Sequence, residues 1–475
     1  MPSFRLRTPL SQRFVRLCGA LLLWALFSNT PLASAKPPLV PTSKLIIPHP
    51  RQIGEEADTI TLLRALQQSL QANLDIARAR ALLQIAQAQQ RTQTLRWLPT
   101  LDIRLDGYLR GGHTQGNFGD ESNLTSPIYQ FSPVAQIHYA LDPARLFLTQ
   151  QATTQRTSAA RHHTQQVQDA VLLATALAYQ SLAQQQIHLS FLAQSIETLQ
   201  KLEQIAEARL RSGIGNQAEV LQIQSRLEQD AQHKLSALLS LRKRMADFSL
   251  LLGRPPHRPL LAHAQDLPLL SFPARSASAP QLFQTILRKH PALAKQRARW
   301  QAFSSLQQSI VLSPWIPSLH LQLTAGLFEA GIFQQKDTLP IGPQYAATLS
   351  LKWSFSLVDL GRNDEMLAHQ QTQQTKIDAL RLALETHTHL ALQRAQITAQ
   401  RRQAAQRFVV TAEQALALTQ ARYKAGTGSL IDVLSSQRTL LYALRAWLDA
   451  TTASNRAQLL LRAMPGHLQP AALLP

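Results

Sequence analysis

The side chains that most readily do chemistry do not converge on a catalytic site in this sequence. Two histidine clusters occur, His162-His163 and His387-Thr388-His389. Neither has the H-E-x-x-H spacing or a nearby cysteine that would complete a zinc site. The run Gly426-Thr427-Gly428 lacks the lysine and the spacing of a P-loop, and no G-x-S-x-G motif is present. We therefore expect no enzymatic activity, no cofactor and no metal site.

Composition favours an exported protein over a nucleic-acid-binding one. The 475 residues carry a formal net charge of +20, but their lysines and arginines are dispersed, not clustered. Residues 1–35 have a basic start, an apolar run from Leu17 to Phe27 and the sequence Ala33-Ser34-Ala35, which together predict a cleaved signal peptide. The single cysteine, Cys18, lies inside it. The mature chain then offers no thiolate ligand and no disulfide.

A charged, glycine-containing turn occurs twice. It reads R-L-R-S-G-I-G-N-Q-A-E at 209–219 and R-Y-K-A-G-T-G-S-L-I-D at 422–432. Basic residues complement the carbonyl end of a helix, and the first glycine of each turn supplies the left-handed residue that ends it. Asn216 and Ser429 can cap the next helix, and Glu219 and Asp432, three residues later, would complete capping boxes. We predict tight helix–turn–helix tips at 212–217 and 425–430.

Three further landmarks repeat in the same order. Trp97-Leu98-Pro99 returns as Trp315-Ile316-Pro317, Asp142 as Asp359, and the run 73–76 more weakly as 290–293. We interpret this as an internal duplication. The predicted divisions are an extended segment at 36–54, a first repeat at 55–252, a proline-rich connector at 253–280, a second repeat at 281–465 and a tail at 466–475.

Long stretches without glycine or proline predict long helices. They cover 144–212, 216–252, 362–425 and 429–464, and a shorter one covers 55–98. Asp142-Pro143 reads as the N-cap and first residue of the first long helix, and Asp359 as the cap of the second. The chain is thus expected to fold into antiparallel helical hairpins.

Four segments alternate apolar and polar residues with the period of a strand. They lie near 100–110, 134–141, 318–328 and 346–357, with loops at 111–127 and 330–344. Such strands suit a barrel wall between lipid and water, and Trp97 and Trp315 suit its interface with the headgroups. Four strands cannot close a barrel, so we expect copies to share one, either twelve strands from three or eight from two. The predicted fold class is an α+β membrane protein.

The ordered motifs resemble the TolC-like outer-membrane efflux family, also called outer membrane factors. The resemblance rests on the two R-x-x-x-G…(D/E)-V-L tips, the W-x-P before each strand pair, the D-x-x-R after it and L-L-G-R-P-P at 251–256. It implies a homotrimer with a shared 12-stranded transmembrane β-barrel and a long α-helical barrel, in the outer membrane of a Gram-negative bacterium. It also implies the exit duct of a tripartite efflux pump or type I secretion system. The implied partners are a periplasmic adaptor (membrane fusion) protein, an inner-membrane pump and outer-membrane lipid, with no nucleic acid.

The resemblance also assigns roles to residues. Asp432 matches an acid that constricts the periplasmic gate, whereas Gly428 and Ser435 stand where a latch arginine and a second acid can occur. The capping box alone would explain Asp432, and the helix dipole alone would explain the basic residues. The implied adaptor-docking residues are Arg209, Gly213, Glu219, Arg422, Gly426 and Asp432. An exported periplasmic coiled-coil scaffold without a pore is the alternative function, although it would have no use for four strands.

Overall fold

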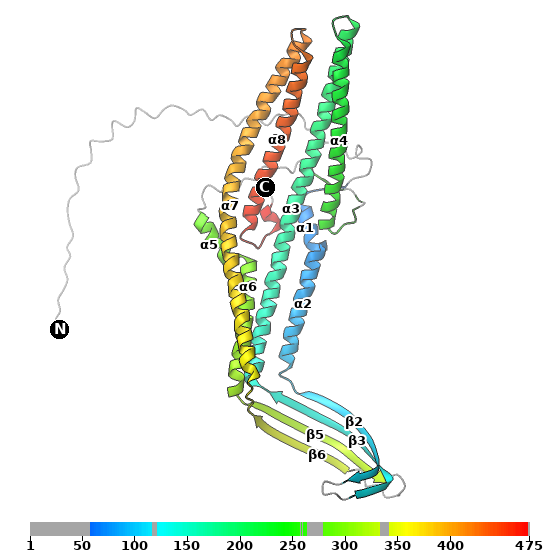
Figure 1. Ribbon diagram of the computed structural model, residues 1–475, viewed down its shortest axis with the longest axis vertical. Coiled ribbons are helices and arrows are strands. Elements are labelled where there is room, and N and C mark those ends of the chain that lie inside the picture. The colour runs from blue at the N-terminus through cyan, green and yellow to red at the C-terminus, as the bar shows by residue number, and fades with distance from the viewer. Residues whose placement is uncertain are drawn as a thin grey trace, which may run out of the picture. The chain divides into compact units, whose positions relative to one another are not determined.

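Figure 1 shows the computed structural model of the protein. The structure describes residues 58–115, 121–256, 258, 260–263, 279–332 and 342–473. The predicted signal peptide, the predicted extended segment at 36–54 and the part of the predicted connector at 264–278 lie outside these residues.

Four long helices lie where the stretches without glycine or proline predict them. Helix α3 spans Pro143–Arg211 and returns as α4, Gln217–Leu251; α7 spans Val358–Lys424 and returns as α8, Leu430–Ala463. Figure 1 shows the two hairpins side by side, with α3 packed against both α4 and α8. None of the described helices combines the length and the apolarity that a membrane crossing requires.

A shorter helical segment precedes each pair of strands, and each of these two segments is interrupted. The predicted helical stretch at 55–98 is instead a short strand, β1 (Asp58–Ile60), followed by α1 (Leu62–Ala72) and α2 (Leu74–Leu95). Helix α1 ends because Asn73 accepts a hydrogen bond from the Asp75 amide (2.9 Å) and donates one to the Leu251 carbonyl (3.0 Å). In the second half, α5 (Ala279–Lys289) and α6 (Pro291–Leu312) are separated at His290, whose ring caps α6.

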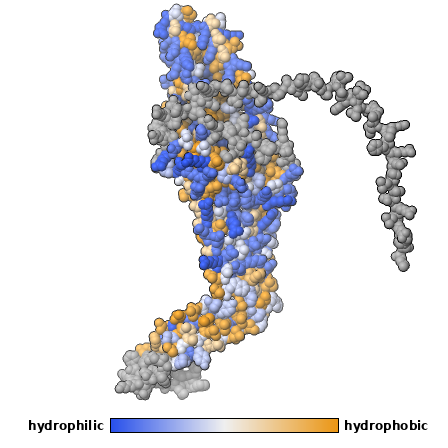
Figure 2. Space-filling view, turned by 180° about the vertical axis from the view of Figure 1, so that it is seen from behind, coloured by the Kyte–Doolittle hydropathy of each residue, from blue (hydrophilic) through white to orange (hydrophobic). Residues whose placement is uncertain are grey.

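The strands form one antiparallel sheet in the order β2-β3-β5-β6. Their bounds are β2 Thr100–Gln115, β3 Glu121–Leu141, β5 Ser318–Ile332 and β6 Gly342–Lys352, with a short 3₁₀ helix, η2 (Ser313–Trp315), before β5. The register sets Leu101 opposite Ile137 and Ile137 opposite Leu323, so apolar side chains share one face. Figure 2 shows hydrophobic residues gathered over the sheet, whereas hydrophilic residues predominate over the helical part, with hydrophobic patches among them.

Four predictions on boundaries are wrong. Strands β5 and β6 extend into the predicted loop at 330–344, as far as Ile332 and from Gly342. Strands β2 and β3 extend into the predicted loop at 111–127, as far as Gln115 and from Glu121, which pair with each other past a bulge; ladder hydrogen bonds persist where side chains cease to alternate. Strand β6 ends at Lys352, whereas the prediction extended it to 357. Helix α7 therefore begins at Val358, and Asp359 lies within its first turn, paired with Arg362 (3.2 Å), instead of capping it.

The predicted connector contributes to the main hydrophobic core. Strand β4 (Leu260–Ala262) pairs in parallel with β1, and both lie beside α1, α3 and α4. A final 3₁₀ helix, η3 (Pro470–Leu473), closes the same core, in which Leu66, Tyr179 and Phe248 are fully buried. Among the described residues, the largest cluster of buried apolar side chains thus lies in this core.

Replacing Gly253 with alanine is expected to destabilise this core strongly. Gly253 has a φ of +65°, and a Cβ there would overlap the Ala72 carbonyl. We expect a loss of about 2–4 kcal/mol in the free energy of unfolding, because strain and overlap add. Urea unfolding followed by circular dichroism measures it. Gly426→Ala is the matched control, with a φ of +78° but open space around it, and about 1–2 kcal/mol is expected. Equal losses in both variants would contradict the overlap.

Candidate functional site at the paired helix tips

The two tips share one turn geometry. Gly213 follows α3 with a φ of +77°, and Gly426 follows α7 with a φ of +78°. The amides of Ile214 and Gly215 both donate to the Arg209 carbonyl, at 3.0 and 2.9 Å. In the second tip the Thr427 amide donates to the Arg422 carbonyl at 3.0 Å. Left-handed glycines thus close both helices while satisfying their last carbonyls.

The second glycine of each turn is required by close packing. A Cβ on Gly215 would lie 2.7 Å from the Leu210 amide nitrogen, and one on Gly428 would lie 2.9 Å from the Cβ of Arg422. Asn216 and Ser429 then cap α4 and α8 by accepting from the amides of Ala218 and Ile431. An arginine at position 428 would therefore disturb this turn.

The acids do not complete capping boxes. The Glu219 carboxylate accepts instead from the hydroxyl of Tyr423, at 3.0 Å, and so connects the start of α4 to the end of α7. Asp432 is exposed, and its carboxylate forms no hydrogen bond or ion pair with the residues that the structure describes. The capping-box prediction is wrong at both tips, because neither side chain turns back to its cap.

Arg209 also reaches the other tip. Its Nη1 donates to the Tyr423 carbonyl at 2.8 Å, and its guanidinium lies 4.7 Å from the centre of the Tyr423 ring. The cation therefore complements the carbonyl end of α7, the neighbouring helix, and adds a cation–π contact. Arg422, its counterpart in the repeat, is exposed.

Tyr423 is the residue that the sequence analysis missed. Its side chain is 1% exposed. It packs in a small core at the tips whose buried members are Leu202, Ala206, Val220, Ile223, Tyr423, Leu430 and Val433. The signal was present, since the first repeat has Leu210 where the second has Tyr423. The structure thus joins Arg209, Glu219 and Tyr423 into one contact between the two hairpins, which we call the tip clasp.

The tip clasp should respond to alkaline pH. Burial, and then the hydrogen bond to Glu219, raise the pKa of Tyr423 from 10.0 to about 12. The neutral phenol is therefore favoured in the folded protein, and its stabilisation is complete below pH 10 and lost as the pH rises through about 12. Phenolate absorbance measured against pH should show one late-titrating tyrosine, which is missing in Tyr423→Phe. Identical titration curves for the two proteins would refute this.

Trp97 and Trp315 lie where the helices meet the sheet. Trp97 connects α2 to β2, and Trp315 ends η2 with an exposed ring that meets Phe355 edge-on at 6.1 Å. Trp353 and Phe355, assigned to a strand from the sequence, follow β6 at the same boundary and are also exposed. Exposed aromatic residues therefore lie at this boundary in both halves of the chain.

The histidine clusters do not converge. Burial is the main reason why the pKa values of His162 and His163 are lowered. The second cause differs, since it is the charge of His467 for His162 and the charge of Lys295 for His163. His387 and His389 are exposed on either side of buried Thr388. In the part of the chain that the structure describes, no three or more His, Cys, Asp or Glu residues are arranged to hold a metal ion.

Comparisons with known proteins agree with this architecture. A family model described as "Outer membrane efflux protein" matches residues 65–254 and 282–467, more than half of the chain. A search of curated proteins found no match.

Solved channels show the same fold at low sequence identity. VceC of Vibrio cholerae aligns with a TM-score of 0.68 and 17% identity, over 86% of this chain and 97% of that one. CmeC of Campylobacter jejuni gives 0.69 and 16%, over 86% and 87%. The open state of MtrE of Neisseria gonorrhoeae gives 0.67 and 18%, over 86% and 90%.

Proposed function

Because the chain belongs to the outer membrane efflux protein family, we propose that it forms a homotrimeric channel in the outer membrane of a Gram-negative bacterium. Family members are efflux channels and not enzymes. The proposed channel is the exit duct of a tripartite efflux pump or type I secretion system. The observation that carries the proposal is an incomplete sheet, with one apolar face, joined directly to a bundle of long helices.

The sheet supports a shared barrel because both of its edges are free. Among the described residues, β2 pairs only with β3 and β6 only with β5. Unpaired backbone groups are not tolerated in hydrocarbon, and a long free edge attracts another strand. Pairing β2 of one copy with β6 of the next would satisfy both edges. Three copies then give the 12-stranded barrel proposed here.

Exposed apolar residues on the outermost helices support the same assembly. Helix α4 exposes Leu221, Leu235, Leu239 and Leu250. Their spacing places them in one stripe, since 100° per residue brings all four within about 60°. At the other side of the protomer, α7 exposes Leu382 and Ile397. A head-to-tail contact joins two different surfaces, here the α4 side of one copy and the α7 side of the next. Such contacts generate a ring when the rotation from copy to copy completes a full turn.

The proposed duplication is supported by the order of elements. Each half contains an interrupted helix, two strands, a long helix, a tip and a shorter helix. The interruptions at Asn73 and His290 are 217 residues apart, as are Asp142 and Asp359. We retain 55–252 and 281–465 as the proposed repeats, joined by the connector at 253–280.

We further propose that the tips form the periplasmic entrance and the adaptor-docking surface. Ile214 is 73% exposed at the first turn, where it can meet an apolar side chain of the adaptor. Arg422, Gly426, Gly213 and Asp432 complete this surface. Arg209 and Glu219 are engaged by Tyr423, so their proposed contribution is to hold the hairpins together. Three exposed Asp432 carboxylates near an axis would form an anionic gate.

Membrane fractionation followed by semi-native electrophoresis tests the proposed function. A heat-modifiable trimer in outer membranes is the expected result, and it should form conducting pores when purified and added to planar bilayers. A soluble, elongated monomer in the periplasmic fraction would reject the channel. That outcome would support the alternative, an exported coiled-coil scaffold without a pore.

A further inference from the structure

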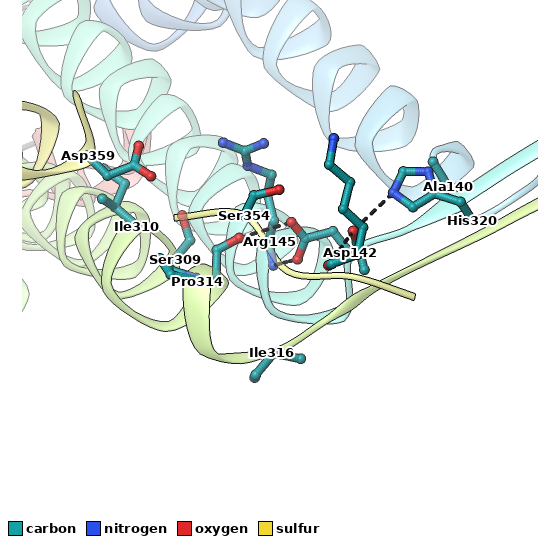
Figure 3. Close-up of a pocket in the computed structure, with 13 residues that line it drawn as sticks. Ala140, Asp142, Arg145, Ser309, Ile310, Pro314, Ile316, His320, Ser354 and Asp359 are labelled. Atoms are coloured by element: carbon teal, nitrogen blue, oxygen red, sulfur yellow. Dashed lines mark hydrogen bonds between the residues drawn. The ribbon is translucent and has the colours of Figure 1, made fainter. Parts of the chain in front are cut away.

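A polar pocket lies at the junction of the helices and the sheet, far along α3 from the tips. Its volume is about 320 Å³, and it receives side chains from the start of α3, the end of α6, β5 and the segment after β6. Figure 3 shows Arg145, Asp142, His320 and Asp359 around it. The tip clasp and the proposed docking surface do not include any of these residues.

The sheet residues of the pocket are all on the polar face. Ala140 pairs with His320, and Ser318 pairs with Lys352, whereas Leu319 and Leu351 between them project from the opposite face. The apolar face is the one proposed to meet lipid. The pocket therefore opens on the water-filled side of the proposed duct, at the periplasmic end of the barrel.

Both carboxylates of the pocket are already occupied. Asp142 caps α3 by accepting from the Arg145 amide (2.9 Å), and its other oxygen accepts from the Ser313 hydroxyl (3.0 Å). Asp359 pairs with Arg362 at 3.2 Å. Arg362 thus neutralises Asp359, whereas Asp142 keeps its charge and offers no free oxygen without breaking a hydrogen bond.

The cations of the pocket have no such partners. Within the described residues, the guanidinium of Arg145 and the ammonium of Lys352 form no ion pair and no hydrogen bond. The Ser318 hydroxyl donates to the Lys352 carbonyl (3.2 Å) and lies 3.0 Å from Nε2 of His320, and Ser354 adds a further hydroxyl. Among the pocket residues that the structure describes, two unpaired cations outnumber the one unpaired carboxylate, Asp142, and with the Ser354 hydroxyl they are groups that bind a carboxylate, sulfonate or phosphate.

We propose that this pocket is an anion-binding subsite on the lumenal wall, which holds the acidic group of an exported molecule in transit. The inference rests on the proposed function, since it takes the polar face to line the duct. In a trimer, three copies would supply six cations at one level. Anionic molecules would then find a favourable site past the acidic entrance, and the class of cargo favoured is one that carries an acidic group.

Block of the current by inorganic phosphate tests the proposal. Phosphate added to the wild-type channel in planar bilayers should reduce the chloride current in a saturable way. In Arg145→Gln/Lys352→Gln the apparent affinity of this block should fall about tenfold or more, because two charge-assisted contacts are lost. Arg104→Gln is the matched control, since Arg104 lies on the same face but is bonded to Gln136; its block should stay within about twofold of wild type. An unblocked wild type, or an equally blocked double variant, would overturn the subsite.

Equilibrium dialysis of labelled phosphate against the detergent-purified chain measures binding to the same site and does not depend on a current. Binding to the wild type and not to the double variant is expected even if no pore forms, so failure of the channel and failure of the subsite are distinguishable. Mass spectrometry of co-purified phospholipid separates a lipid phosphate from a free one. Equal lipid content in both proteins is expected, and loss of lipid from the double variant would instead place the pocket against the membrane.

Discussion

Replacing Tyr423 with phenylalanine is expected to increase the open probability and the conductance of the reconstituted channel. The ring remains and fills the same core, but the hydrogen bond from the Tyr423 hydroxyl to Glu219 is lost. A hydrogen bond to a charged group contributes about 1.5–3 kcal/mol, and Glu219 would also be left beside an apolar ring. The equilibrium between the clasped conformation and a more open one should therefore shift by roughly ten- to a hundredfold.

The measurement is single-channel recording, with Tyr442→Phe as the matched control. Tyr442 is a tyrosine on α8 that is 67% exposed and packs edge-on against Phe408, outside the tip clasp. Its loss of a hydroxyl should leave the conductance unchanged. Asp432→Ala separates the proposed anionic ring from the clasp, because it removes an exposed charge and leaves Tyr423 in place. A Tyr423→Phe channel that behaves like wild type would show that the clasp does not hold the entrance.

Introducing two aspartates on α4, Leu235→Asp/Leu239→Asp, is expected to abolish the proposed trimer. These leucines are 67% and 72% exposed in the single chain and point away from the α3 side of α4, where Ala237 and Leu241 are buried. Burying two leucines between subunits would contribute about 3–6 kcal/mol, and buried unpaired carboxylates would reverse that gain. Semi-native electrophoresis and native mass spectrometry should show monomers in place of trimers.

Ser236→Asp/Ser240→Asp is the matched control for the interface. Both serines are exposed on α4 next to the leucines. Aspartates at these two positions add the same charge to a flank of the same helix. Trimers are expected to persist in this variant. If both double variants stay trimeric, the stripe on α4 is not the contact between subunits, and other surfaces, such as the edges of the sheet, hold the copies together.

Much of the fold could be predicted because local rules decide it. Helices α3 and α7 end, and α4 and α8 begin, within one residue of the predicted breaks. The glycines that close the first pair and the caps Asn216 and Ser429 of the second pair act through neighbouring backbone groups. Alternation likewise located the sheet, because successive side chains of a strand lie on opposite faces. Boundaries that depend on distant partners were predicted less well. Asn73 ends α1 with the help of the Leu251 carbonyl, 178 positions away in the chain.

The candidate site divides in the same way. The sequence by itself determined the two tips, their glycines and their charged residues, because each turn is closed by hydrogen bonds among consecutive residues. Only the tertiary structure decided what those charges do. Glu219 and Arg209 face Tyr423, which lies more than 200 positions away, and spacing alone could assign them only to their own helices. The pocket beside Lys352 arises for the same reason, since the sheet register and the packing of α3 against α6 bring its walls together.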